Sequence, residues 1–87
     1  MASYKLVVKE SVAKDLRAIP GKDVSRILRR IESLPYNPCP PGCEKLSVQE
    51  RYRIRQGVYR IVYEIEDSVL TVTVVKIGRR KKVYSRR

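Results

Sequence analysis

The chain has 87 residues, and its 20 lysines and arginines against 9 acidic residues give a formal net charge of +11 at pH 7. A single domain over residues 1–87 is expected, because chains divide into domains only well beyond about 200 residues. The absence of histidine excludes histidine zinc sites, Ser-His triads and acid–base catalysis by imidazole. So basic a chain attracts polyanions, which makes nucleic acid, an anionic membrane or an acidic protein the partner classes to consider.

The N-terminal part predicts one strand and two helices. Residues 4–9 are rich in β-formers and predict a strand. Ser11 is the expected N-cap of a short helix that Pro20 and Gly21 end. A longer helix is expected from about residue 22 to Pro35, with one apolar face made by Val24, Ile27, Leu28, Ile31 and Leu34. Its opposite face carries Arg26, Arg29, Arg30 and Glu32.

A stiff connector over residues 36–43 contains three prolines, one glycine and both cysteines. Two cysteines cannot build a disulfide framework, and the first residues lack the apolar stretch of a secretory signal, so a cytoplasmic protein is expected. Cys39 and Cys43 supply only two metal ligands, which is short of a structural zinc site. We therefore expect free thiols and no bound metal, with a redox-sensitive local disulfide as the alternative. No apolar run approaches the roughly 20 residues of a membrane-spanning helix, so no membrane partner is expected.

Beyond the connector the apolar period changes from 3.6 to 2, which is typical of strands. Strands are expected over residues 51–55, 58–65 and 69–77, and the last is apolar on both faces, as in a sheet interior. Gly78 is expected to end it, before a tail over residues 79–87 with six positive charges. The order β-α-α-β-β-β predicts a two-layer α+β fold with a helical pair packed on one face of a small sheet.

The hairpin in this region is expected to carry a cationic face. Its apolar residues must share the core side, so the arginines project from the other side. With the loop at Gln56-Gly57, Arg53 is expected directly opposite Arg60. Two opposed arginines repel one another, so a phosphate chain explains such a face better than solubility alone; a merely solvated outer face is the alternative. The tyrosines expected to pack in the core are Tyr52, Tyr59 and Tyr63.

Three segments in this order resemble the RelE/ParE superfamily of bacterial toxin–antitoxin toxins: YRIR at residues 52–55, GVYRIVY at 57–63 and IGRRKKVY at 77–84. The front half is similar too, with a strand, two helices and an Asn37-Pro38 connector leading to Lys45-Leu46. The resemblance implies a single RelE-like toxin domain with a mainly antiparallel sheet. It also implies one of two activities, since RelE-like members cut messenger in the ribosomal A site without metal and ParE-like members inhibit DNA gyrase.

The RelE-like branch implies a catalytic set that this chain fills at every position: Arg53, Arg55, Arg60, Arg80 and Tyr84. Arginines replace the lysines that the best-known RelE proteins carry at the first two positions, which keeps charge but not the capacity to transfer a proton. Tyr84 also lies two residues closer to Arg80 than in those proteins. The remaining basic residues are expected to contact phosphates and to add affinity without sequence choice: Lys45, Arg51, Arg79, Lys81, Lys82, Arg86 and Arg87.

Cleavage by the 2′-hydroxyl of RNA needs a base, charge relief on the phosphorane and a proton for the leaving oxygen. Guanidinium groups suit the charge relief. Tyr84 is the candidate base, because neighbouring cations favour its phenolate; an aromatic anchor for the tail is the alternative. Arg80 is a poor acid but the available proton donor, and Glu64 is an alternative base that more readily offsets Arg60.

The resemblance implies partners but no cofactor. A RelB-like, acidic antitoxin is expected to cover the cationic face or to displace the tail that carries Arg80 and Tyr84. The ribosomal A site and messenger RNA are the expected targets, and DNA is expected to be met only through the antitoxin complex. Two alternatives stay open: a ParE-like gyrase inhibitor without nuclease activity, and a non-catalytic basic domain that binds RNA or a partner.

Overall fold

The protein is described by a computed structural model that covers residues 3–46 and 51–79. Five strands form one sheet in the order β1-β5-β4-β3-β2, in which β1 pairs parallel with β5 and the other neighbours are antiparallel. The elements in chain order are β1 (Lys5–Val8), α1 (Glu10–Arg17), α2 (Gly21–Ser33), β2 (Glu44–Leu46), β3 (Arg51–Gln56), β4 (Tyr59–Glu66), the 3₁₀ turn η1 (Asp67–Val69) and β5 (Thr71–Arg79). This confirms the α+β fold with a mainly antiparallel sheet.

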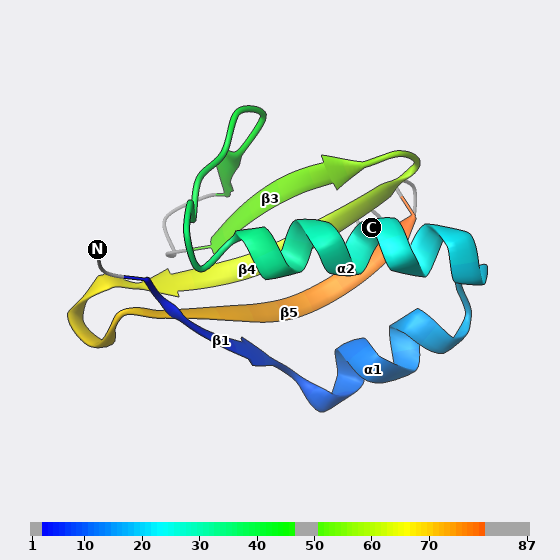
Figure 1. The fold of residues 1–87 in the computed structure, drawn as a ribbon, viewed down its shortest axis with the longest axis horizontal. Helices are drawn as coiled ribbons and strands as arrows, with labels where there is room; N and C mark the ends of the chain where they lie inside the picture. Colours follow the sequence, from blue (N-terminus) through cyan, green and yellow to red (C-terminus); the bar gives the residue numbers. More distant parts are fainter. Residues whose placement is uncertain (1–2, 47–50, 80–87) are drawn as a thin grey trace.

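Both helices cover the same side of the sheet. Figure 1 shows α2 lying across β3 and β4, with α1 beside β5. Val12 of α1 and Ile27 and Ile31 of α2 join one buried cluster with inward-facing residues of β3, β4 and β5. Tyr59 and Tyr63 belong to that cluster and Tyr52 packs against it, so the three tyrosines expected in the core are there.

The apolar face of α2 is narrower than predicted. Ile27, Ile31 and Leu34 are buried, at a spacing of four and three residues. Leu28 is 38% exposed, because a residue one position from Ile27 lies about 100° around a helix of 3.6 residues per turn. The stripe that seals the core is therefore a single i, i+4, i+7 line.

The start of α1 also differs from the prediction. Ser11 lies inside the helix, and Lys9 occupies the N-cap position. The Lys9 amide donates to the carbonyl of Val74 at 3.1 Å, which continues the pairing of β1 with β5. The Lys9 carbonyl accepts from Val12 at 2.9 Å. The backbone thus passes from strand to helix at Lys9, before a serine cap is needed.

Strand β5 is continuous through Gly78, which does not end it as predicted. Its register with β4 shifts between Val62 and Tyr63, which leaves one extra residue in β5 at that point. The shift explains why Val72, Val74 and Ile77 are all buried although their spacing changes from two to three. Because the bulge changes the spacing, buried residues occur at both even and odd positions of β5, and the sequence alone therefore indicates a strand that is apolar on both faces.

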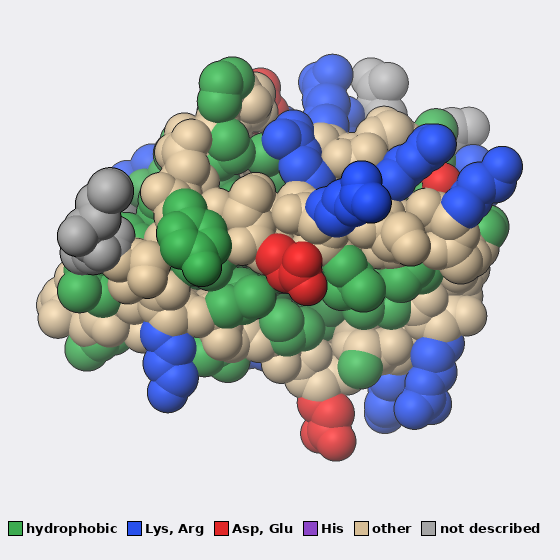
Figure 2. All heavy atoms as spheres, in the orientation of Figure 1, with side chains coloured by type: hydrophobic (Ala, Val, Ile, Leu, Met, Phe, Trp, Pro, Cys, Tyr) green, Lys and Arg blue, Asp and Glu red, His purple; other side chains and the backbone are tan. Residues whose placement is uncertain are grey.

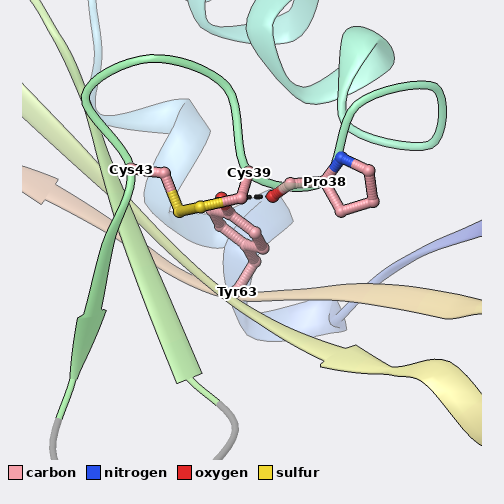
Figure 3. Close-up of a disulfide and its surroundings, with 4 residues drawn as sticks. All are labelled: Pro38, Cys39, Cys43 and Tyr63. Carbon is pink, nitrogen blue, oxygen red and sulfur yellow. Dashed lines mark hydrogen bonds between the residues drawn. A yellow bond between two sulfur atoms is a disulfide. The ribbon is translucent and has the colours of Figure 1, made fainter.

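The connector before β2 holds a disulfide, so the expectation of free thiols is wrong. Cys39 and Cys43 are bonded, with their Cα atoms 5.3 Å apart (Figure 3). A tight turn brings them together, because Gly42 takes φ 93° and the Cys43 amide donates to the Pro40 carbonyl at 2.9 Å. The turn leads directly into β2, a three-residue edge strand that the sequence pattern did not predict.

Tyr63 anchors this connector to the sheet. Its hydroxyl donates to the Pro38 carbonyl at 2.6 Å and lies 3.4 Å from the sulfur of Cys43 (Figure 3). Burial, with a smaller contribution from Tyr52, raises the pKa of Tyr63 to about 12. The hydroxyl therefore stays protonated and keeps its donor role at any physiological pH.

Replacing Tyr63 with phenylalanine should lower the free energy of unfolding by about 1 kcal/mol, because the Pro38 carbonyl loses its donor while packing is kept. Urea denaturation measures this loss. Tyr36→Phe is the matched control, since Tyr36 is 79% exposed, and it should be neutral. Equal effects of the two substitutions would contradict the anchoring role.

Replacing both cysteines with serine should cost about 2 kcal/mol of stability, the chain-entropy value for the five-residue loop closed by residues 39 and 43. Denaturant midpoints with and without a thiol reductant measure it. The reductant should lower the midpoint of the wild-type protein and leave the double-serine variant unchanged. A reductant effect on both proteins would contradict the assignment.

Candidate functional site

The hairpin of β3 and β4 presents its arginines on the sheet face opposite the helices. Ile54 pairs with Ile61, and both are buried in the core under the helices. Side chains alternate along a strand, so the neighbouring arginines project from the other face. The predicted shared face is confirmed. We name as the cationic face the four basic residues placed there by β3 and β4: Arg51, Arg53, Arg55 and Arg60.

The pairing within this face differs from the prediction by two residues. Arg55 lies directly opposite Arg60, and Arg53 is only diagonal to it. The two-residue loop consists of Gly57 and Val58, and not of Gln56 and Gly57 as predicted. Gly57 takes φ 61° at the first loop position, where glycine is favoured. Moving the loop by one residue moves every partner by two, and the faces stay the same.

Arg60 is the centre of the cationic face. Only 2% of its surface is exposed, and it is flanked by Arg55 on β3 and Gly78 on β5. Gly78 places no side chain beside it. An arginine keeps its positive charge even when it is buried. Arg60 interacts with other groups of the protein, and the charge of Glu44 is among those that act on it. The adjacent guanidinium groups of Arg55 and Arg60 nevertheless concentrate positive charge, which attracts anions to this point.

Glu44 supplies a carboxylate that sequence reasoning missed. It lies opposite Arg53 in the register of β2 and β3, and its Oε1 pairs with the guanidinium of that arginine. The hydrogen bond from Arg53 holds the pKa of Glu44 below its usual value, helped by the charges of Arg53, Arg55 and Arg60. The charges of three arginines thus stabilise one ionised carboxylate, and these four residues together retain a net positive charge. In the sequence, Glu44 is marked only as an acidic residue directly after Cys43.

Glu64 pairs with Arg51, and not with Arg60 as expected. The Nε of Arg51 lies 2.8 Å from the Oε2 of Glu64, and the two residues are directly opposite in the register. The side chains are 42% and 35% exposed, so the pair adds little stability. The pairing means that the carboxylate of Glu64 is engaged with Arg51 at the edge of the cationic face.

Two of the residues expected to contact phosphate lie on the helix side of the sheet. Lys45 is opposite Tyr52, and Arg79 is opposite Tyr59, so both share the side of those tyrosines. They are not part of the cationic face. The other predicted site residues fall outside the described part of the chain: Arg80, Lys81, Lys82, Tyr84, Arg86 and Arg87.

A hollow of about 450 Å³ extends from the cationic face toward α1. Arg51, Lys9 and Lys76 line it, together with the apolar side chains of Val62 and Val75. Lys76 lies 3.8 Å from a carboxylate oxygen of Asp15. Cations around an apolar floor suit a nucleotide, whose phosphate and base need different surroundings.

Within residues 3–46 and 51–79, no group of three or more Cys, Asp or Glu side chains is placed to hold a metal ion. Over the same ranges, no helix has the length and apolar composition needed to cross a membrane.

Fold and site together define a small, basic, two-layer α+β protein with an arginine-rich sheet face. A family model described as "ParE toxin of type II toxin-antitoxin system, parDE" matches residues 6–84. A Methanocaldococcus jannaschii protein described as a candidate toxin, RelE1, is 29% identical over 87 residues, which cover 93% of this chain and 94% of that protein.

Solved structures show the same fold. A chain of the RelBE2 toxin–antitoxin complex of Mycobacterium tuberculosis has a TM-score of 0.78 at 21% identity, over 90% of this chain and 99% of that one. A chain of the RelB–RelE complex of Methanococcus jannaschii has a TM-score of 0.73 at 27% identity, over 90% and 94%. The protein belongs to the RelE/ParE superfamily of type II toxin–antitoxin toxins.

Replacing Glu44 with glutamine should strengthen binding of single-stranded RNA, because a carboxylate no longer competes with phosphate for Arg53. The slope of log affinity against log salt should steepen by about 0.7, one further phosphate contact. Glu10→Gln, exposed in α1, is the control for net charge and should change the slope less. Equal slopes in the two variants would show that Glu44 is not part of the site.

The same variant tests the lowered pKa of Glu44. The stability that the ionised carboxylate contributes is present above its usual value of 4.5 and is lost as the pH falls through the lowered pKa. The stability difference between the wild-type protein and Glu44→Gln should therefore hold from pH 7 to about pH 4.5 and disappear in stronger acid. A constant difference down to pH 2 would be the contrary result.

Proposed function

We propose that this toxin is a metal-independent endoribonuclease that cuts messenger RNA in the ribosomal A site. The observation that carries the proposal is the direct pairing of Arg55 with the buried Arg60, beside Arg53. Adjacent guanidinium groups repel one another, and the arrangement becomes more favourable around a phosphate, which attracts them both. It becomes more favourable still around a phosphorane, which carries one more negative charge than the phosphate it came from.

The described residues narrow the choice of a general base. Tyr63 is engaged with Pro38 and its pKa is raised, so it does not supply a phenolate. Glu64 is paired with Arg51, and Glu44 has a lowered pKa that makes it a weak base. Tyr84 remains the proposed base for the 2′-hydroxyl, with Arg80 beside the leaving oxygen. Both assignments come from the resemblance of residues 77–84 to RelE-like toxins.

Dependence on the ribosome is part of the proposal. Arginine holds its proton tightly, and the chain has no histidine, so acid–base catalysis by the protein alone is weak. Holding the message in an in-line geometry supplies much of a rate by proximity. A ribosome that presents the codon in this way compensates for the missing imidazole, and free RNA should be a poor substrate.

An acidic antitoxin is the proposed partner in the cell. The M. tuberculosis and M. jannaschii structures are complexes of a toxin with its antitoxin. A net charge of +11 favours an acidic segment, whose attraction also speeds capture. Contact with the cationic face would place the antitoxin where the message binds.

Gyrase inhibition is the second candidate, because the matching family model is that of ParE toxins. The two activities separate in one experiment. The protein is added to a translating extract, message ends are mapped by primer extension, and gyrase supercoiling is measured in parallel. Codon-positioned cuts with normal supercoiling support the proposal. Intact messages with blocked supercoiling would overturn it.

Replacing Arg60 with glutamine should lower the cleavage rate on programmed ribosomes by about 10²–10³, the effect of losing one electrostatic donor in the transition state. Glutamine is preferred to alanine because Arg60 is buried, and truncation would leave a cavity. Arg17→Gln, exposed in α1, removes the same charge and should cut at the wild-type rate. Single-turnover kinetics measure both variants, and an unchanged rate for Arg60→Gln would refute its role.

A further inference from the structure

The outer surface of α2 carries a second group of arginines that the proposed cleavage does not use. Arg26, Arg29 and Arg30 follow one another at i, i+3 and i+4, which brings their Cβ atoms within about 5–6 Å. Figure 2 shows basic side chains gathered along α2. We name these three residues the arginine cluster. Since α2 packs on the core side, the cluster lies on the opposite side of the sheet from the cationic face.

The arginine cluster surrounds a hollow of about 350 Å³, whose other lining residues are Ser33 and Gln56. No carboxylate lines this hollow, and among the described residues no ion pair involves any of the three arginines. Asp23 lines a neighbouring hollow together with Arg26. The guanidinium groups therefore concentrate positive charge around an open space. Asp23 and Glu32 flank the arginine cluster along α2 but do not line this hollow.

Arg30 is the fixed member of the arginine cluster. Its Nη2 lies 3.4 Å from the carbonyl oxygen of Arg55 on β3, at the limit of a hydrogen bond. Its Nε is buried and has no hydrogen-bond partner. A buried donor without an acceptor costs free energy, and an anion near the guanidinium lowers the electrostatic energy of its charge without reaching the buried Nε. Arg26 and Arg29 are exposed beside it and complete the anion-binding surface.

We propose that the arginine cluster binds the sugar–phosphate backbone of base-paired RNA. Planar guanidinium groups pair with phosphate oxygens in a bidentate way. The amide of Gln56 adds a neutral hydrogen-bond donor for a phosphate oxygen, and the Ser33 hydroxyl, which donates to the Arg30 carbonyl at 2.7 Å, has an oxygen that accepts from a 2′-hydroxyl. The hollow has no aromatic lining residue on which an unpaired base stacks, which favours backbone contacts to a duplex over a single strand.

The same lining argues against a protein segment as the occupant. A peptide that folds on binding anchors itself with apolar side chains in apolar pockets. All five residues around this hollow are polar or charged. The inference extends the proposed function, because a protein with RNA sites on both sides holds structured RNA at α2 while it presents the cationic face to a message.

The test measures binding to an RNA duplex of about 16 base pairs, the length that a double-stranded RNA-binding domain spans. The variant carries Arg26→Gln and Arg29→Gln, which leaves Arg30 and its contact to β3 in place. The control carries Lys14→Gln and Arg17→Gln, two exposed residues of α1, and so has the same net charge. Thermal melting of the free proteins establishes that both remain folded.

The α2 variant should bind the duplex at least about tenfold more weakly than the control, and the salt slope should fall by about 1.8 for two lost phosphate contacts. Equal losses in both variants would overturn the inference, because net charge alone would then explain binding. Unchanged duplex affinity, with weakened binding of an antitoxin, would also overturn it and assign the surface to protein. A larger α2-dependent affinity for the DNA duplex of the same sequence would overturn it too.

This assay contains neither ribosome nor message, so it is independent of cleavage. Arg60→Gln serves to separate the two proposals, because it should slow cutting by about 10²–10³ and leave the α2-dependent part of duplex binding intact. If wild-type protein fails to cut messages but loses duplex binding only through the α2 variant, the surface stands and the nuclease proposal falls.

Discussion

The pairing of Ile54 with Ile61 determines on which face of the sheet the arginines of β3 and β4 lie. Both side chains are buried under the helices, so a slip of one residue would move the arginines of β3 and β4 into the core. The hydrophobic free energy of the core therefore holds Arg55 against Arg60 despite their repulsion. The cationic face is a consequence of that constraint. Burial of the apolar side of the hairpin keeps the arginines together on the opposite side although they repel one another.

Periodicity predicted most of the fold and the side on which the site lies. The stripe of Ile27 and Ile31 on α2 and the alternation along β4 follow from burying one face of an element, which a sequence records directly. The face of Arg53 and Arg60 follows from the same alternation and was correct. The face on which a side chain lies is predicted reliably, because moving the loop by one residue changes the cross-strand partners by two positions and leaves the faces unchanged.

Features that depend on local backbone geometry were not predictable in this way. The loop position follows from the positive φ of Gly57, and the spacing of core residues in β5 follows from a bulge that no composition signal marks. The disulfide depends on a turn at Gly42 that brings two cysteines together in space. Glu44 lies on β2, a strand too short to show a periodic pattern. The sequence therefore indicated the arginines of the site but not the carboxylate that pairs with Arg53.

We propose that arginines, without imidazole, promote attack by the RNA 2′-hydroxyl on its own phosphate. The most direct measurement uses programmed ribosomes with a message that carries a single 2′-deoxynucleotide on the 5′ side of the cleavage site. We expect the all-RNA message to be cut and to leave a 2′,3′-cyclic phosphate, whereas the substituted message should stay intact. Cutting of the deoxy-substituted message at a comparable rate would contradict this proposal, because the nucleophile would then be water and not the substrate.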